Sequence, residues 1–347
     1  MTDPVRRLLL IKPSSLGDIV HAMPTLAALR VGFPHTEVTW LVKRQWAPLV
    51  EVIRGVDQVC VVETGLSGWL GRVRELRAAR FDLVIDLQGL FRSGAMAWLT
   101  GSGRRIGFAD AREGSPLFYT QRVKVPGAPM HAVDRYLLLA EALGAARPAQ
   151  PLFEFVDHPE DRQAVETILG KAGTAASLPW IAINASARWE TKRWLPQHFA
   201  EAADQLAHAL ALPIVFIGGQ AERQESLAVM ALMRTKAVDL TGQTPVGLLP
   251  SLLRQAAVLI TNDSGPMHIA AAVGTPVVAL FGPTDPRRTG PYGSGHLVLT
   301  HAVECSPCFS RDCTRAVRLE CLTAVRPEQV VHAVQQQLER SPKQRSL

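Results

Sequence analysis

Short apolar runs alternate with stretches of helical periodicity along most of the chain. In EVTWLVK (37–43) and FDLVIDLQG (81–89), apolar side chains fall on both faces of an expected strand. Strands that are apolar on both faces and separated by helices predict a parallel sheet covered by helices on both sides. In the first half, the pattern predicts strands at 7–12, 37–43, 58–63, 81–89 and 104–108 and helices at 19–31, 69–80, 91–100 and 131–144.

The composition changes between 145 and 178 and then the alternation restarts. This stretch is rich in Ala, Pro, Gly and Ser around one short helix that starts near Pro159, and it predicts an inter-domain linker. A final helix is expected from Pro327, since proline is favoured in a first helical turn. In the second half, the pattern predicts strands at 180–186, 213–219, 237–242, 257–263 and 276–282 and helices at 196–210, 221–234, 246–255, 265–273 and 327–339.

The length supports two domains. A chain of 347 residues is long for one hydrophobic core and suits two. We expect an α/β protein with two doubly wound, Rossmann-like parallel-sheet domains, at 1–160 and 175–325. Residues 326–347 are expected to form a C-terminal helix and tail that pack back on the first domain. Two such domains facing a cleft would hold ligands at the carboxyl ends of their strands.

Composition narrows the class of protein. Hydrophobic residues make up 47% and charged residues 20%, as in soluble globular proteins, and no apolar run reaches the ~20 residues that span a bilayer. The first apolar run is followed by Gly-Asp and not by a cleavage site, which predicts a strand, not a signal peptide, and a cytoplasmic protein. A net charge of +6 and a pI of about 9.3 favour anionic partners only weakly. Among anionic partners, which include phosphorylated sugars, nucleotides, acidic membrane surfaces and nucleic acid, nucleic acid is the least supported, since no zinc-finger or RNA-binding signature is present.

A polar turn follows the first predicted strand, in IKPSSLGDIVHAMP (11–24). Gly17 permits a tight turn, and Asp18 falls at the start of the next helix. Asp is a preferred helix-capping residue, but the first strand-to-helix turn of such a sheet is also a common ligand site. The segment alone leaves both interpretations of Asp18 open.

A basic loop, NASARWETKRWLP (184–196), follows the first strand of the second half. It carries Arg188, Lys192 and Arg193, and three cations at the carboxyl end of a strand suit a phosphate group. A solvated basic loop is the alternative. The two tryptophans of the segment weaken that alternative because they predict a packed, ordered loop.

The segment TNDSGPMHIAAAVGTPVVALFGPTDP (261–286) has polar residues directly before and at the start of the helix predicted at 265–273. Unpaired N–H groups and the positive end of the dipole favour phosphate there, and Ser264 and Gly265 lie at this point. Asp263 would repel phosphate and is better suited to capping or to accepting from sugar hydroxyls. His268, one turn into the helix, either lines the ligand site or belongs to the core.

Four of the five cysteines are close together in sequence, as Cys305-x2-Cys308-x4-Cys313-x7-Cys321. The spacing is compatible with a structural zinc or iron site of four thiolates. Disulfides are disfavoured in the cytoplasm, but free thiols or a redox-labile disulfide would explain the cluster almost as well. We predict no catalytic role for it. Cys60, alone in an apolar strand, is predicted to be a core residue.

Taken in order, these motifs resemble those of the bacterial lipopolysaccharide heptosyltransferases. The resemblance lies in KPSSLGDIVHAMP, DLQGLFRSG (86–94), DAREGSPLFYT (110–120), TKRWLP and 261–286, and it covers nearly the whole chain. It implies the two-domain GT-B fold and inverting transfer of heptose from ADP-heptose. DLQGLFRSG with AREGSPLFY is closer to heptosyltransferase I, which adds the first heptose to Kdo, than to heptosyltransferase II.

The resemblance also implies a mechanism. Asp18 matches the family's essential aspartate, the general base for the Kdo hydroxyl that attacks the anomeric carbon. Lys192 matches the loop lysine that neutralises charge on the departing ADP. The chain has no Asp-x-Asp motif, and inverting GT-B enzymes generally need no divalent ion. No cofactor is therefore expected for catalysis, and the helix dipole and Lys192 would stabilise the leaving pyrophosphate.

Binding residues follow from the same matches. The acceptor would be held by Ser15, Gly17 and Arg112. A basic segment at the position of the family's acceptor-contacting loop adds further candidates, for which a solvated helix face is the alternative: Arg72, Arg74 and Arg77. The donor would be held by Ser186, Lys192, Asp263, Ser264, Gly265 and His268.

The acceptor that the resemblance implies, Kdo-lipid A, carries a lipid tail. It therefore implies peripheral contact with the inner face of the cytoplasmic membrane, helped by a basic surface. A distantly related group of protein heptosyltransferases carries iron bound by cysteines, which supports the structural metal site. The alternatives are heptosyltransferase II, another transferase of the family with a different acceptor, or a nucleotide-sugar-binding protein without catalysis. Asp18 together with Lys192 argues against the last.

Overall fold

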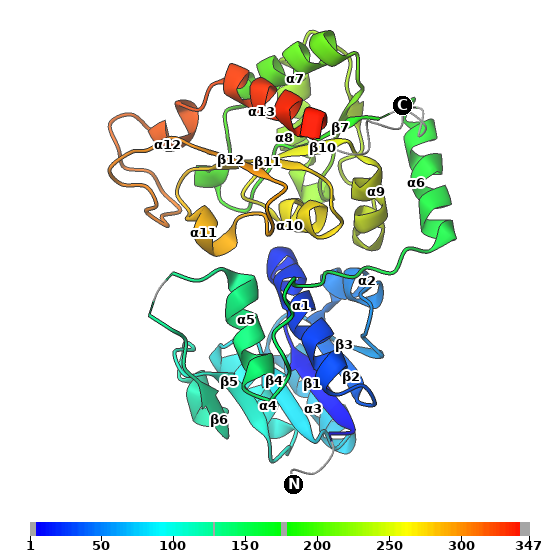
Figure 1. Cartoon of the computed structure of the whole chain (residues 1–347), viewed down its shortest axis with the longest axis vertical. Coiled ribbons are helices and arrows are strands. Elements are labelled where there is room, and N and C mark those ends of the chain that lie inside the picture. Colours follow the sequence, from blue (N-terminus) through cyan, green and yellow to red (C-terminus); the bar gives the residue numbers. More distant parts are fainter. Residues whose placement is uncertain (1–4, 128, 175–178, 341–347) are drawn as a thin grey trace. The chain divides into compact units, whose positions relative to one another are not determined.

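A computed structural model describes residues 5–127, 129–174 and 179–340 (Figure 1). The chain divides into two compact units, Met1–Val156 and Asp157–Leu347. The division falls within the stretch where the sequence predicts a linker. Helix α6 (Pro159–Lys171) packs on α9 (Leu249–Gln255) and so belongs to the second unit. No helix of the described ranges is both long enough and apolar enough to cross a membrane.

The first unit is built on a sheet of six parallel strands in the order β3-β2-β1-β4-β5-β6. The strand order reverses at β1, so the loops that leave β1 and β4 diverge and open the usual ligand position of a doubly wound sheet. Side chains of α3 and α4 pack with β1 to β4 in one apolar core. Helix α1 packs on α5 (Figure 1). The strands are β1 (Arg7–Ile11), β2 (Glu37–Lys43), β3 (Gln58–Val62), β4 (Leu83–Asp86), β5 (Arg105–Phe108) and β6 (Gln121–Val123), and the helices are α1 (Leu16–Gly32), α2 (Ala47–Glu51), α3 (Leu66–Ala78), α4 (Phe91–Leu99) and α5 (Ala132–Glu141).

The second unit repeats this plan with the strand order β12-β11-β10-β7-β8-β9. The order reverses at β7, whose last residue Asn184 pairs in register with Thr261 of β10. The loops after these two strands therefore begin side by side. The strands are β7 (Ile181–Asn184), β8 (Ile214–Phe216), β9 (Val238–Asp239), β10 (Val258–Asn262), β11 (Val277–Phe281) and β12 (Leu297–Thr300), and the further helices are α7 (Pro196–Leu210), α8 (Arg223–Met230), α10 (Gly265–Ala272), α11 (Pro286–Thr289), α12 (Glu320–Thr323) and α13 (Pro327–Arg340).

Helix α13 buries its apolar face within its own unit. Val330, Val334 and Leu338 lie in the core formed with α7 and strands β10 and β11. The sequence analysis expected the C-terminal helix to pack back on the first domain. The apolar stripe of this helix covers the sheet of the second unit, and the expected tail, residues 341–347, lies outside the described residues.

The two sheets confirm the predicted fold class of two doubly wound α/β domains. Strand β2 and helix α7 have the predicted bounds, and most other elements differ by a few residues at their ends. The pattern missed the short edge strands β6 and β12. Their burial alternates or is slight, because an edge strand is packed on fewer sides than a central one.

Candidate active site

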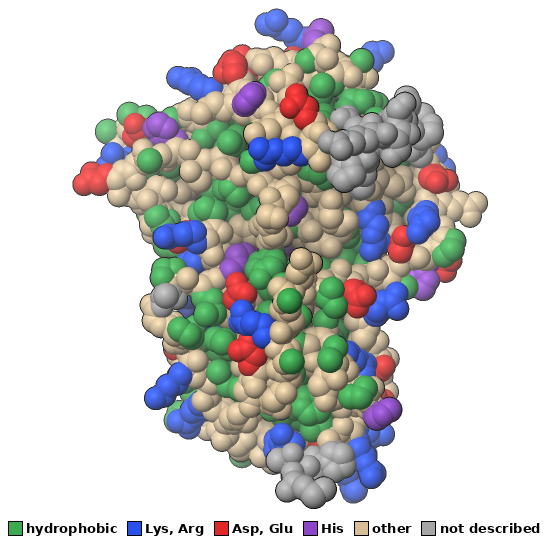
Figure 2. Space-filling view, in the orientation of Figure 1, with side chains coloured by type: hydrophobic (Ala, Val, Ile, Leu, Met, Phe, Trp, Pro, Cys, Tyr) green, Lys and Arg blue, Asp and Glu red, His purple; other side chains and the backbone are tan. Residues whose placement is uncertain are grey.

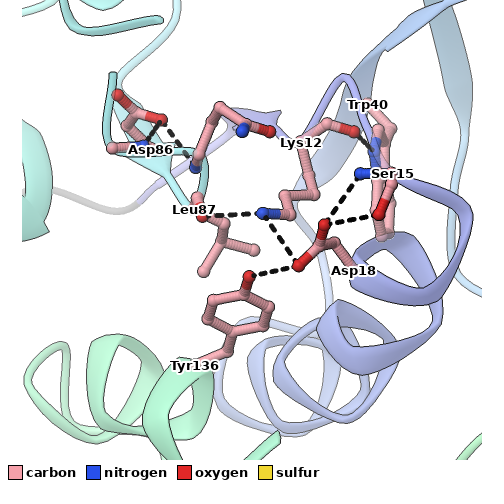
Figure 3. Close-up of polar contacts among 9 residues, drawn as sticks. Lys12, Ser15, Asp18, Trp40, Asp86, Leu87 and Tyr136 are labelled. Atoms are coloured by element: carbon pink, nitrogen blue, oxygen red, sulfur yellow. Dashed lines mark hydrogen bonds and ion pairs between the residues drawn. The ribbon is translucent and has the colours of Figure 1, made fainter. Parts of the chain in front are cut away.

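In the first unit, polar side chains gather where β1 runs into α1. We call Lys12, Ser15, Asp18 and Tyr136 the Asp18 cluster (Figure 3). The amide and hydroxyl of Ser15 donate to Asp18 Oδ2 over 2.8 and 2.7 Å. Ser15 is the N-cap of α1, and Asp18 lies in the first turn. The positive end of the helix dipole stabilises a carboxylate at that position. Asp18 is thus a partner of the cap and not the cap itself.

Asp18 combines fixed geometry with access to solvent. Its other oxygen, Oδ1, accepts from the Tyr136 hydroxyl over 3.3 Å and lies 3.8 Å from Lys12 Nζ. The side chain is nevertheless 39% exposed. The cluster therefore holds a reachable carboxylate in one orientation.

Lys12 is almost fully buried at the end of β1. Its ammonium donates to Leu87 O over 3.2 Å and lies 4.9 Å from the centre of the Tyr136 ring. Burial alone would lower the pKa of Lys12, but Asp18 and Tyr136 outweigh it and the pKa lies above its ordinary value. The lysine therefore stays charged beside Asp18.

Tyr136 stays neutral beside the same carboxylate. Burial is the main cause that raises the pKa of Tyr136, to about 12, with Lys12 opposing and Asp18 adding to the shift. A hydroxyl that keeps its proton at physiological pH can donate to Asp18. Sequence reasoning missed both Lys12 and Tyr136 as site residues; the signal for Lys12 was a cation at the end of an otherwise apolar strand.

A buried carboxylate orders the loop that Lys12 contacts. Asp86 accepts from the amides of Gln88 and Gly89 and, over 2.7 Å, from the Tyr119 hydroxyl. Burial raises the pKa of Asp86, and these donors oppose the rise. The Tyr119 ring lies against Gly107, where an added Cβ would come within 2.3 Å of it. Asp86 therefore fixes the turn whose Leu87 carbonyl receives the Lys12 ammonium.

In the second unit, a matching group lies at the adjoining ends of β7 and β10. We call Asn184, Lys192, Asp263, Ser264 and Thr284 the Lys192 cluster. Lys192 Nζ donates to Asp263 Oδ2 over 2.6 Å, and Thr284 Oγ1 donates to the same oxygen over 2.7 Å. The Lys192 side chain is 17% exposed and that of Asp263 only 7%. The pair is therefore partly desolvated, where charges interact more strongly than in water.

The Ser264 hydroxyl does not cap α10, the helix that it precedes. It bonds instead with Asn184 Oδ1 over 2.9 Å and with Thr261 Oγ1 over 2.8 Å. The hydroxyl is thus drawn towards the end of β7, and the first-turn N–H groups of α10 receive no bond from it. Such groups at a helix start suit an anion.

Asn262 ties the loop that carries Lys192 to the sheet. Its Oδ1 accepts from the Trp194 amide over 3.0 Å, and its Nδ2 donates to Ala185 O over 2.8 Å and to Ser186 O over 3.4 Å. Trp194 is buried, as the sequence pattern predicted for an ordered loop. The loop is therefore fixed at both ends of the segment that presents Lys192.

The structure separates the three cations of this loop. Lys192 joins Asp263, whereas Arg193 pairs with Glu225 over 2.8 Å and donates to Ala187 O. Arg188 is exposed. Of the expected donor residues, Ser186 and His268 are buried and Gly265 is half-buried as the first residue of α10.

The expected acceptor residues are only partly brought together. Ser15 belongs to the Asp18 cluster, and Gly17 is buried in the first turn of α1. The Arg112 amide donates to Gly89 O over 2.9 Å, which places this exposed residue beside the loop after β4.

The basic residues of α3 lie along the helix and do not form one group. Arg72 donates to Val61 O and pairs with Glu75 over 2.7 Å, whereas Arg74 is exposed. Arg77, in the last turn, lines a hollow of about 450 Å³ beside the starts of β4 and β5. The carboxyl ends of the strands, where Asp18 lies, are at the opposite edge of the sheet. Arg77 is therefore not part of the group around Asp18.

The four clustered cysteines line one small cavity of about 30 Å³. All are free thiols. Burial raises the pKa of Cys321 to about 11, and the neighbouring Cys308, Cys305 and Cys313 add to the shift. Within the ranges that the structure describes, however, no three His, Cys, Asp or Glu side chains are placed to hold a metal ion. The geometry does not support the expected zinc or iron centre, and we derive no chemistry from one.

The loop that carries these cysteines contacts the segment before Lys192. Thr191 Oγ1 donates to Ser310 O over 2.9 Å, and Arg318 pairs with Glu190 over 3.1 Å. The Arg311 guanidinium and the Lys192 ammonium both lie over the Trp189 ring, at 5.2 and 4.6 Å from its centre. The cysteine loop therefore supports the segment that positions Lys192.

Comparison with known proteins gives these clusters a context. Residues 70–317 match the family described as glycosyltransferase family 9 (heptosyltransferase). Lipopolysaccharide heptosyltransferase 1 of Pseudomonas aeruginosa is 30% identical over 89% of this chain and 87% of that protein. The lipopolysaccharide core heptosyltransferase OpsX of Haemophilus influenzae is 27% identical over 84% of each chain. Lipopolysaccharide heptosyltransferase 2 of Escherichia coli is also 27% identical, over 82% of this chain and 85% of that one.

Solved structures agree with the sequence matches. A crystal structure of a family 9 glycosyl transferase from Veillonella parvula is 27% identical and superimposes with a TM-score of 0.87, over 98% of this chain and 99% of that one. The heptosyltransferase WaaC of E. coli, solved with ADP, is 22% identical with a TM-score of 0.70, over 96% and 98% of the two chains. At that identity the likeness supports the fold alone.

Proposed function

The chain belongs to glycosyltransferase family 9, the heptosyltransferases, and we propose that it transfers heptose from ADP-L-glycero-D-manno-heptose to the Kdo of the lipopolysaccharide inner core, with inversion. The observation that carries the proposal is the Asp18 cluster: a half-exposed carboxylate, held by Ser15 and Tyr136, at the strand end where a doubly wound sheet binds ligands.

Asp18 is the general base in this proposal. The Kdo hydroxyl gives its proton to the carboxylate as its oxygen attacks the anomeric carbon of heptose. Fixing the carboxylate through Ser15 and Tyr136 orients the oxygen that receives the proton, and this orientation lowers the barrier. The bond from the anomeric carbon to the phosphate oxygen breaks as the new glycosidic bond forms, and ADP leaves from the opposite face.

The Lys192 cluster stabilises the leaving group. Negative charge grows on the pyrophosphate as the glycosidic bond to ADP breaks, and the Lys192 ammonium with the first N–H groups of α10 offers positive charge to it. Ser264 and Gly265 stand at that helix start, while Asp263 receives Lys192 and Thr284. We assign Asp263 to holding the lysine and accepting from donor hydroxyls, with Ser186 and His268 in the surrounding wall.

The acceptor assignment favours the first heptose. DLQGLFRSG and AREGSPLFY support heptosyltransferase I, and a heptosyltransferase 1 is 30% identical to this chain. The relatives also include a heptosyltransferase 2, and a transfer assay with the two acceptors distinguishes the first heptose from the second. Catalysis is proposed to need no metal, since lysine and helix N–H groups supply the positive charge that a cation would otherwise bring. Work on a lipid-anchored acceptor further implies a cytoplasmic protein in peripheral contact with the inner membrane face.

A transfer assay tests the proposal directly. ADP-heptose is offered with Kdo-lipid A or with an acceptor that already carries one heptose, and the products are identified by mass spectrometry. We expect transfer to Kdo-lipid A in the presence of a chelator. Preference for the heptosylated acceptor would reassign the chain to heptosyltransferase II. Binding of ADP-heptose with no transfer to either acceptor would leave a nucleotide-sugar-binding protein.

A further inference from the structure

Two large apolar side chains, Phe91 and Leu117, are exposed close to a half-buried third, Phe118, in the first unit. Phe91 is 56% exposed and Leu117 78% exposed. The Phe91 ring meets the half-buried ring of Phe118 edge to face, with centres 5.3 Å apart. Single exposed apolar residues are normal, but a contiguous group rimmed by polar residues marks an interaction surface. We call Phe91, Leu117 and Phe118 the apolar patch.

The patch is joined to the edge of the sheet that carries Asp18. Phe91 opens α4, directly after the loop whose Leu87 carbonyl receives the Lys12 ammonium. Phe118 precedes Tyr119, which donates to Asp86 at the start of that loop. The loop after β4, which Lys12 and Asp86 order, therefore joins the patch to the Asp18 cluster.

Two exposed cations rim the patch, Arg92 and Arg112. The side chain of Arg92 is exposed, and its guanidinium lies 5.6 Å from the centre of the buried Trp69 ring. One acid is present as well: Glu113 Oε2 accepts from the Phe91 amide over 3.2 Å. Its charge is directed to the start of α4, where it is favourable. The rim thus offers the Arg92 guanidinium to an anionic surface, next to Arg112, which is assigned to the acceptor.

The overall distribution of charge does not by itself locate a site that binds an anionic partner. On the face drawn in Figure 2, Lys and Arg side chains are scattered among Asp and Glu over both units. A peripheral membrane site needs apolar side chains that enter the headgroup region together with cations at the same place. The apolar patch with Arg92 provides both.

We propose that the apolar patch docks the enzyme on an anionic phospholipid bilayer, with Phe91 and Leu117 among the headgroups and Arg92 on lipid phosphates, while Arg112 is kept for the Kdo of the acceptor. The proposal rests on the proposed function, since it places the bilayer beside the site for a lipid-anchored acceptor. The sugar to be modified lies close to the bilayer surface, so a docking surface at the edge that carries Asp18 lets the base reach it.

The test compares binding and transfer in the same variants. The full chain is sedimented with vesicles of phosphatidylcholine, with and without phosphatidylglycerol. We expect binding only with phosphatidylglycerol, weakened by salt. Leu117→Ser should reduce the fraction of protein bound to vesicles. The double variant Phe91→Ser with Leu117→Ser should reduce that fraction roughly tenfold. Arg92→Gln should make binding less dependent on salt. Val31→Ser replaces an aliphatic side chain that is 76% exposed in the last turn of α1, and it should bind as the native protein does.

Transfer assays separate this proposal from the proposed function. With a water-soluble, delipidated Kdo acceptor, Leu117→Ser should transfer heptose at the native rate, and it should be slower only with acceptor in vesicles. Vesicle binding without transfer to either acceptor would overturn the function and leave the docking surface standing. If the native protein does not sediment with anionic vesicles, or if Leu117→Ser sediments with them as fully as the native protein, the proposed docking surface is overturned. The docking surface is also overturned if the native protein is a dimer and Leu117→Ser dissociates it, because a second copy of the chain would then cover the patch.

Discussion

The ammonium of Lys192 and the carboxylate of Asp263 lie 2.6 Å apart, and Thr284 donates to the same carboxylate oxygen. The contact joins the loop after β7 to the end of β10, because the strand order of the second sheet reverses between them. A leaving pyrophosphate would compete with Asp263 for the ammonium. Thr284 would then remain as a donor to Asp263, so the carboxylate would not be left without a partner.

Replacing Lys192 tests this exchange. Lys192→Met should lower kcat by roughly 10²-fold or more, the usual cost of removing one group that stabilises transition-state charge. Arg188→Gln removes an exposed cation of the same loop and should leave kcat unchanged. Steady-state kinetics with ADP-heptose make the comparison, and equal losses in the two variants would mean that only the general charge of the loop matters.

Removing the carboxylate of Asp18 should separate binding from chemistry. Asp18→Asn keeps the shape but cannot take the proton, so transfer should fall by roughly 10²- to 10⁴-fold while ADP-heptose still binds in calorimetry. Ser15→Ala keeps the base and loses only one of its donors, so it should cost far less. Native turnover in Asp18→Asn would falsify the assignment of the base.

The pattern of apolar residues predicted the fold because central strands are buried on both faces and read as continuous apolar runs. It also singled out Asp18, Lys192 and Asp263 as polar residues at strand ends, but left their roles open until the resemblance was considered. It could not pair Asp18 with Tyr136. That residue lies 118 positions from Asp18 and, within α5, has the spacing of a core aromatic. Only the packing of α5 on α1 brings its hydroxyl to the carboxylate.

The raised pKa of Tyr136 predicts a pH dependence of stability. The folded chain holds this proton more tightly than the unfolded chain, so the contribution is fully present below pH 10 and is lost as pH rises to about 12. Each unit of pKa difference corresponds to about 1.4 kcal/mol. Tyr136→Phe should flatten the fall in unfolding free energy over this window in urea titrations. A fall as steep as that of the native protein would assign it to other groups.

The support of Lys192 by the cysteine loop predicts an effect from a residue that touches no substrate. Thr191→Val keeps the shape but loses the bond to Ser310 O, worth about 1 kcal/mol. Lys192 should then be less well held, which raises the KM for ADP-heptose severalfold and leaves the KM for the acceptor unchanged. Thr167→Val, which loses an exposed bond within α6, is the matched control. A change in both KM values would indicate general loosening of the fold.

Arg112 and Arg77 give opposite expectations, although the resemblance assigned both to the acceptor. Arg112 is exposed and its amide is tied to the loop after β4, at the sheet edge that carries Asp18. Arg77 lies in the last turn of α3, beside Arg80 and Arg104 and near the amino ends of the strands. An anionic Kdo bound beside Asp18 can meet a guanidinium only at its own edge. Arg112→Gln should therefore raise the acceptor KM by roughly tenfold, whereas Arg77→Gln should leave it unchanged. An equal rise in both variants would mean that the acceptor is drawn in by overall charge, and added salt would then abolish the rise in each.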